Sequence, residues 1–168
     1  MKIAVYPGSF DPITSGHLNI IQRASKIFDK VIVCVMVNSG KAPMFNREER
    51  VMLIQQSIGD MPNVEVDSSD ELLAAYAKRK GSCVIIKGLR AGSDFENEFQ
   101  MALINHSINS NLDTMFLTAE HQYMYLSSST VKELGRYDVD LSGFLPPPII
   151  PVFKQRMADI QLEGEKKI

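Results

Sequence analysis

The sequence has few of the features that mark membrane, metal-dependent or nucleic-acid-binding proteins. Its 168 residues include only two cysteines. Cys34 and Cys83 lie in separate apolar runs without metal-ligand spacing, so we expect two buried, reduced thiols. No stretch approaches the roughly 18 apolar residues of a membrane span, and the chain begins with the strand-like Lys2–Tyr6. These observations predict an unprocessed, cytoplasmic protein with no membrane partner.

An excess of charge of either sign is also missing. The 18 basic and 20 acidic side chains give a net charge of −2. No overall positive field therefore attracts nucleic acid or an anionic membrane surface, and an anionic ligand must be bound by local groups. No cluster of Asp, Glu, His or Cys has metal-ligand spacing, so we expect no metal site formed by the protein itself.

Two common phosphate-binding motifs are missing as well. The sequence has no G-x-x-x-x-G-K-[ST] segment, and the glycines nearest the first predicted strand, Gly8 and Gly16, do not form G-x-G-x-x-G. Their absence disfavours a P-loop ATPase and a dinucleotide-dependent dehydrogenase.

Five apolar, β-branched runs alternate with segments of helical spacing. The runs are Ile3–Tyr6, Val31–Val37, Val64–Val66, Cys83–Ile86 and Met115–Thr118. Continuous apolar runs are typical of strands that are covered on both faces. We therefore predict an α/β fold: a doubly wound, Rossmann-like, five-stranded parallel sheet with helices on both faces. Without an internal repeat or linker, residues 1–168 are expected to form one domain, with a flexible tail from about residue 160.

Helix starts and apolar faces can also be predicted. Asn46 with Glu49, and Ser93 with Glu96, have the spacing of capping boxes. A last helix is expected near Ile149–Ala158, after three consecutive prolines. Two apolar stripes at helical spacing predict core-facing sides for the first and fourth helices. Their members are Ile20, Ile21, Ala24, Ile27 and Phe28, and Phe95, Phe99, Ala102, Leu103 and His106.

The segment Tyr6–His17, YPGSFDPITSGH, lies between the first predicted strand and the first predicted helix. In an open α/β sheet, ligands bind at the carboxyl ends of strands, where helix N-termini favour anions. Gly16 would let a ligand approach the backbone, and His17 lies in the first helical turn. A single histidine at this position is more often a cap or a surface residue, but the surrounding turn favours a phosphate-binding role.

Three segments together resemble the bacterial phosphopantetheine adenylyltransferases, a family within the T/H-x-G-H nucleotidyltransferases. They are PGSFDPITSGH, IKGLR at Ile86–Arg90 and LSSSTVK at Leu126–Lys132. The resemblance extends over residues 1–158. It implies adenylyl transfer from ATP to 4′-phosphopantetheine, giving dephospho-coenzyme A and pyrophosphate. It also implies Mg²⁺ carried by ATP, a homo-hexamer and feedback binding of coenzyme A.

The resemblance also implies roles for individual residues. The catalytic positions are His17, which would contact the α-phosphate, together with Lys41 and Arg90. Phosphopantetheine would be bound by Ser9, Lys41, Leu73 and Lys87. ATP would be bound by Ser9, Phe10, His17, Gly88, Leu89, Arg90, Glu98, Tyr123, Met124, Tyr125, Leu126, Ser127, Ser128 and Ser129.

Two positions depart from the family pattern. Many members have Arg where this chain has Lys87, which keeps the charge but loses bidentate geometry. Several relatives have tryptophan where this chain has Tyr123, which leaves the adenine side of the site open. Leu73 can also be read as a core residue, and Ser127–Ser129 as helix caps.

Two other functions remain open from the sequence. One is a related nucleotidyltransferase with a different acceptor, such as a glycerol-phosphate cytidylyltransferase or a nicotinate-mononucleotide adenylyltransferase. The other is a non-catalytic module that binds a nucleotide as a sensor or scaffold. The presence of His17, Lys41 and Arg90 argues against the second.

Overall fold

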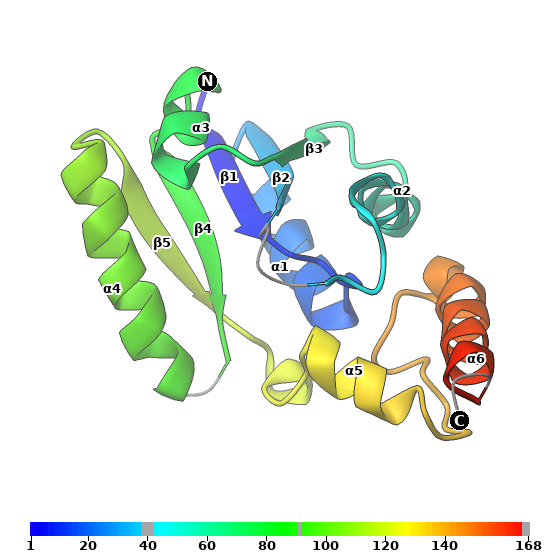
Figure 1. Cartoon of the computed structure of the whole chain (residues 1–168). Helices are drawn as coiled ribbons and strands as arrows, with labels where there is room; N and C mark the ends of the chain where they lie inside the picture. The colour runs from blue at the N-terminus through cyan, green and yellow to red at the C-terminus, as the bar shows by residue number, and fades with distance from the viewer. Residues whose placement is uncertain (38–41, 91, 166–168) are drawn as a thin grey trace.

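The strands and helices alternate along the chain (Figure 1). The structure is a computed structural model that describes residues 1–37, 42–90 and 92–165. The strands are β1 (Ile3–Gly8), β2 (Lys30–Met36), β3 (Val64–Ser69), β4 (Val84–Leu89) and β5 (Asp113–Thr118). The α-helices are α1 (Ser15–Ser25), α2 (Arg47–Ile58), α3 (Leu73–Arg79), α4 (Gly92–Ile108), α5 (Ser128–Leu134) and α6 (Ile150–Glu165). Short 3₁₀ turns, η1 (His121–Tyr123) and η2 (Pro147–Ile149), precede α5 and α6.

The five strands form one parallel sheet in the order β3-β2-β1-β4-β5. The central strand β1 places Val5 opposite Ile32 of β2 and Ile85 of β4. From β1 the chain adds strands first on one side and then on the other. The switch point therefore lies between β1 and β4, and a ligand site is expected at the carboxyl ends of these two strands.

Alternate residues of β1 belong to separate cores. Ala4 and Tyr6 join the large cluster that includes Ile21 of α1 and Leu53 of α2. Val5 faces the other way and joins the cluster of Tyr76 from α3. Helices thus cover both faces of the sheet, which confirms the predicted doubly wound fold.

The prediction that the apolar stripe of α4 faces the core was wrong. Phe95, Phe99 and Leu103 are 45%, 47% and 57% exposed, although the two phenylalanine rings stack at 5.5 Å. Helix α4 packs on the edge of the sheet, against β4 and β5 (Figure 1). Much of its apolar surface is therefore left uncovered by the described residues. In α1, Ile20, Ile21 and Ala24 are buried as predicted, whereas Ile27 is 52% exposed.

Other differences arise at element ends. Cys83 is exposed rather than buried, because it precedes β4 instead of lying within it. Helix α6 continues to Glu165, past the expected end at Ala158. The Asn46–Glu49 capping box is confirmed by two hydrogen bonds of 2.8 and 2.7 Å. Within the described ranges, no helix combines the length and hydropathy needed to cross a membrane.

Candidate active site

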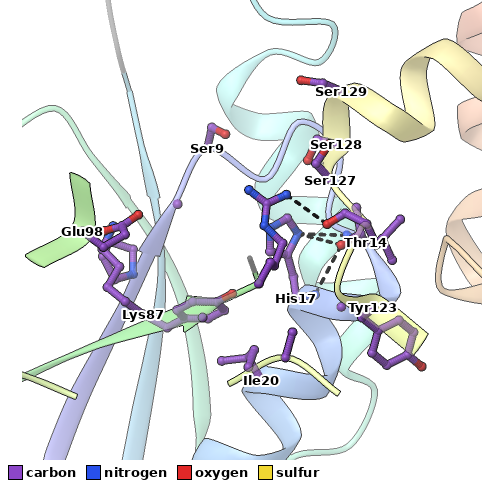
Figure 2. A pocket seen from close by; sticks show the side chains of 18 of the residues that line it. Ser9, Thr14, His17, Ile20, Lys87, Glu98, Tyr123, Ser127, Ser128 and Ser129 are labelled. Atoms are coloured by element: carbon purple, nitrogen blue, oxygen red, sulfur yellow. Dashed lines mark hydrogen bonds and ion pairs between the residues drawn. The ribbon is translucent and has the colours of Figure 1, made fainter. Parts of the chain in front are cut away.

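A cavity of about 490 Å³ lies where β1 and β4 end, at the switch point of the sheet. Figure 1 shows α5 beyond the arrowheads of these strands. The β1–α1 turn, the end of β4, α4 and the turn before α5 all contribute to its wall (Figure 2). The residues that line it are Tyr6, Pro7, Gly8, Ser9, Thr14, Gly16, His17, Ile20, Lys87, Gly88, Arg90, Asn97, Glu98, Ala119, Tyr123, Leu126, Ser127, Ser128 and Ser129.

The β1–α1 turn is shaped by a buried aromatic side chain. Phe10 is 1% exposed and has a left-handed backbone with φ of 46°. Its ring makes edge contacts with Tyr6 and His17, at centroid distances of 5.4 and 5.1 Å. A Cβ added to Gly8 would lie 2.9 Å from the Phe10 ring, so this position requires glycine. The packing leaves Gly8 and Ser9 on the cavity wall, while Phe10 lies beneath it.

His17 is oriented by the N-cap of its own helix. The backbone N–H of Thr14 donates to Nδ1 of His17 at 3.1 Å, and the Thr14 hydroxyl accepts from the His17 N–H at 3.3 Å. Because Nδ1 accepts a hydrogen bond, the proton of a neutral imidazole must be on Nε2. His17 also lines the cavity. The N-cap therefore makes Nε2–H the ring's available donor.

The surroundings of His17 keep its ring neutral. Burial of the ring, with a smaller contribution from the Arg90 charge, lowers the pKa of His17 from 6.5 to about 4. Desolvation acts in this direction because it disfavours the charged form. At neutral pH, His17 is thus an uncharged ring whose remaining donor, Nε2–H, can bond to a phosphate oxygen.

Two cationic side chains come from the end of β4 and the residue after it. The Lys87 ammonium lies 3.0 Å from the Glu98 carboxylate of α4 (Figure 2). Arg90 donates to the Leu126 carbonyl at 3.0 Å, which connects the end of β4 to the turn before α5. The cavity therefore contains positive charge next to neutral donors, as binding of a polyphosphate requires.

The serine-rich segment both caps α5 and lines the cavity. The Ser127 hydroxyl accepts from the Thr130 N–H at 3.0 Å, which makes Ser127 the N-cap. The Ser128 hydroxyl donates to the Pro12 carbonyl at 2.7 Å. The two interpretations of these serines, as caps and as part of a binding site, are therefore geometrically compatible.

Most of the predicted site residues lie together around the cavity. Those that line it are Ser9, His17, Lys87, Gly88, Arg90, Glu98, Tyr123, Leu126, Ser127, Ser128 and Ser129. Phe10, Leu89, Met124 and Tyr125 do not line it, although each neighbours a residue that does. Leu73 packs instead against the cores beneath α3, and Lys41 lies outside the described residues. The roles of these residues stay predictions.

Some lining residues were missed by the sequence analysis. Tyr6 and Ile20 carry the ordinary signals of core residues, and Asn97 and Ala119 follow no motif. Only the fold shows that Ile20 lies against Gly88, where an added Cβ would be 3.2 Å from the Ile20 side chain. Among the residues that the structure describes, no three His, Cys, Asp or Glu side chains are placed to hold a metal ion.

A parallel sheet with a charged cavity at its switch point is the arrangement of nucleotide-binding α/β proteins. A family model described as cytidylyltransferase-like matches residues 5–134. A phosphopantetheine adenylyltransferase of Alkaliphilus metalliredigens is 53% identical over 156 residues, which cover 93% of this chain and 99% of that protein. One of Clostridium tetani is 53% identical over 150 residues, covering 89% and 94%. The chain therefore belongs to the cytidylyltransferase-like family and, within it, to the phosphopantetheine adenylyltransferases.

The fold is shared with a solved structure of much lower sequence similarity. The nicotinic acid mononucleotide adenylyltransferase of Plasmodium falciparum, complexed with NaAD, superposes with a TM-score of 0.64. The two sequences are 16% identical, and the superposition covers 96% of each chain. At this identity the likeness shows the common fold alone.

Proposed function

We propose that this chain transfers the adenylyl group of ATP to 4′-phosphopantetheine, giving dephospho-coenzyme A and pyrophosphate. The observation that carries the proposal is the position of His17. Its neutral ring carries its proton on Nε2 and lines a switch-point cavity that Lys87 and Arg90 also line. The family membership supplies the acceptor.

The reaction makes modest chemical demands on the protein. A phosphate oxygen of 4′-phosphopantetheine attacks the α-phosphorus of ATP; a new P–O bond forms, and the bond to the β-phosphate oxygen breaks. The nucleophile is already an anion, so no general base and no covalent intermediate are required. The protein must align the two substrates and stabilise the charge on the α-phosphate oxygens.

Each wall of the cavity would perform part of this task. The Nε2–H of His17 would donate to an α-phosphate oxygen, and Arg90 with the N-terminus of α5 would bind the β- and γ-phosphates. Lys87 and Ser9 would contact the acceptor phosphate, with Lys41 beside it. Glu98 would contact the ATP ribose, and Tyr123 would lie near the adenine.

We further propose that Mg²⁺ enters as its complex with ATP. Its ligands would be phosphate oxygens and water, as is usual for magnesium at triphosphate sites. The ion would neutralise part of the triphosphate charge, and EDTA should abolish turnover in a way that excess Mg²⁺ restores.

The decisive experiment is incubation of the chain with ATP, Mg²⁺ and 4′-phosphopantetheine, with mass detection of dephospho-coenzyme A. Parallel reactions with nicotinate mononucleotide or glycerol phosphate as acceptor, and with CTP in place of ATP, test the related nucleotidyltransferases. Turnover with another acceptor but not with 4′-phosphopantetheine would overturn the substrate assignment. Binding of ATP without turnover of any acceptor would indicate a sensor or scaffold.

Assembly into a homo-oligomer is supported by the apolar face of α4. This face exposes Phe95, Phe99 and Leu103 to solvent, and large exposed apolar patches mark interaction sites. The resemblance suggests a hexamer and feedback binding of coenzyme A. Light scattering after gel filtration tests the first, and displacement of bound ATP by coenzyme A tests the second.

A further inference from the structure

Asp11 is a buried carboxylate in the β1–α1 turn that the mechanism above does not use. The residue is 7% exposed, and it accepts hydrogen bonds from the backbone N–H groups of Met44 and Phe45 at 2.9 and 2.8 Å. Its Oδ2 also lies 2.8 Å from the Lys132 ammonium of α5. A single side chain thus connects the β1–α1 turn, the segment before α2 and helix α5.

Lys132 is the basic residue that ends the third family motif, LSSSTVK. A lysine at the end of a phosphate-binding motif would be expected to reach the phosphates, yet Lys132 is not among the residues that line the cavity. Its ammonium points instead to Asp11, with the side chain 34% exposed. The position of Lys132 therefore suggests an indirect role.

We propose that Asp11 and Lys132 form a positioning pair, which fixes the serine wall of the cavity (Ser127–Ser129) against the β1–α1 turn. Lys132 then acts through Asp11 and does not touch the triphosphate. The proposal rests on the proposed function only in using turnover as one of its measurements.

A second contact joins the same two parts of the fold, helix α5 and the β1–α1 turn. The Ser128 hydroxyl donates to the carbonyl of Pro12, the residue after Asp11. Ser128 is at the start of α5 and Lys132 is one turn further along the helix, so the two contacts fix both the position and the rotation of α5. Ser9 of the β1–α1 turn and His17 of α1 line the cavity together with these serines. A shift of α5 would therefore change the distance across the cavity.

The charge state of Asp11 suits this role. Burial tends to raise the pKa of the Asp11 carboxyl, but the hydrogen bonds from Lys132, Met44 and Phe45 together outweigh burial and hold the pKa below its ordinary value. Asp11 is thus ionised at neutral pH. Asparagine in its place would keep the shape but lose the charge, and it could not accept from all three donors. Phe45 bonds to Oδ1, whereas Met44 and Lys132 bond to Oδ2, and in asparagine one of these two atoms becomes an NH₂ donor.

A double-mutant cycle tests the proposal with Asp11→Asn, Lys132→Met and the combined variant. Each single change is expected to lower kcat by between about 10- and 100-fold, the size of effect that misplaced groups produce. The kcat of the combined variant should be no lower than that of the less active single variant, because both changes break the same contact. Any loss of ATP affinity, measured by calorimetry without acceptor, should be of similar size in all three variants, because all of them release the same wall of the cavity.

Two outcomes would overturn the proposal. If Lys132→Met loses ATP affinity by about tenfold or more while Asp11→Asn retains it, Lys132 contacts the triphosphate directly. If both single variants melt earlier but keep wild-type kcat at a temperature where they are folded, the pair is structural only. If Asp11→Asn does not fold, the test uses Lys132→Arg in its place. Because arginine keeps the charge that pairs with Asp11, this variant should retain most of the turnover that Lys132→Met loses.

Hydrogen exchange gives a readout that does not depend on turnover. The Thr130 amide donates to the Ser127 hydroxyl at the N-cap of α5, so its hydrogen bond involves neither member of the pair. Its exchange should be faster in Asp11→Asn and unchanged in the control Glu133→Gln, which breaks an exposed ion pair with Arg136 near the end of the same helix. Absence of turnover in the wild-type protein would contradict the proposed function. Unchanged Thr130 exchange in Asp11→Asn would contradict the positioning role of the pair.

Discussion

The backbone N–H of Thr14 donates to Nδ1 of His17 at 3.1 Å, so the capping box that begins α1 also determines which ring nitrogen carries the proton. The T-x-G-H spacing follows from this geometry, because a capping box joins the N-cap residue to the side chain three positions later. Gly16 lies between them on the cavity wall. The motif is therefore a helix start that presents an Nε2–H donor to the site.

The role of this donor is tested by His17→Ala. Loss of one transition-state donor is expected to lower kcat by about 10²–10³-fold, while ATP binding stays close to that of the wild type. The matched variant His17→Gln places an amide N–H near the position of Nε2 and should retain more activity. Steady-state kinetics with ATP titration checks both, and near-full turnover in His17→Ala would remove His17 from catalysis.

The lowered pKa of His17 predicts a pH-dependent stability. The folded ring titrates near pH 4, whereas 6.5 is its ordinary value. Between these values the unfolded chain binds more protons, so stability is present above pH 6.5 and is lost as pH falls toward 4. Relative to His17→Gln, the wild type should lose about 2 kcal/mol of unfolding free energy between pH 7 and pH 5. Urea unfolding at the two pH values measures this; parallel losses in both proteins would show that His17 titrates normally.

The sequence predicted the layers of the fold because continuous apolar runs such as Val31–Val35 require cover on both faces. It could not predict the strand order, which depends on where each crossover places the next strand. The apolar period of α4 was detected, but a period does not show whether a face meets the chain's own core. Phe95 and Phe99 were therefore assigned to the core and are exposed.

The residues of the candidate site were likewise predicted only in part. Residues in motifs, such as His17 and Ser128, were predicted and line the cavity. Asn97 and Ala119 were missed, because nothing in their residue type indicates a ligand. Asp11 lies within a recognised motif, yet its partners Met44 and Lys132 are far away in the sequence and only the fold brings them together.

Lys87 and Glu98 are predicted to serve different substrates despite their ion pair at 3.0 Å. Lys87→Met should raise the KM for 4′-phosphopantetheine by about 10- to 100-fold, as expected for loss of a charged hydrogen bond, with little change in the KM for ATP. Glu98→Gln should act mainly on the KM for ATP. Initial rates with each substrate varied in turn separate the two; a rise in the same KM for both variants would show a shared role.

Lys41 follows β2 and lies outside the described residues, so its role depends on the family motif alone. Lys41→Ala is expected to raise the KM for 4′-phosphopantetheine more than the KM for ATP, because the lysine is assigned to the acceptor phosphate. Lys26→Ala, at an exposed position after α1, is the control. An equal effect on both substrates would move Lys41 to the triphosphate.

Gly8 allows a substitution test of the packing beneath the cavity. Gly8→Ala would place a Cβ 2.9 Å from the Phe10 ring, and that ring is confined by its contacts with Tyr6 and His17. Overpacking of this kind should cost about 1–3 kcal/mol of unfolding free energy. It should also lower kcat, since a displaced Phe10 ring pushes on Tyr6 and His17, which both line the cavity. Gly143→Ala is the matched control, because a Cβ there meets nothing within 4 Å. Denaturant unfolding and turnover are measured for both variants; a stable, fully active Gly8→Ala would show that Phe10 moves without disturbing the site.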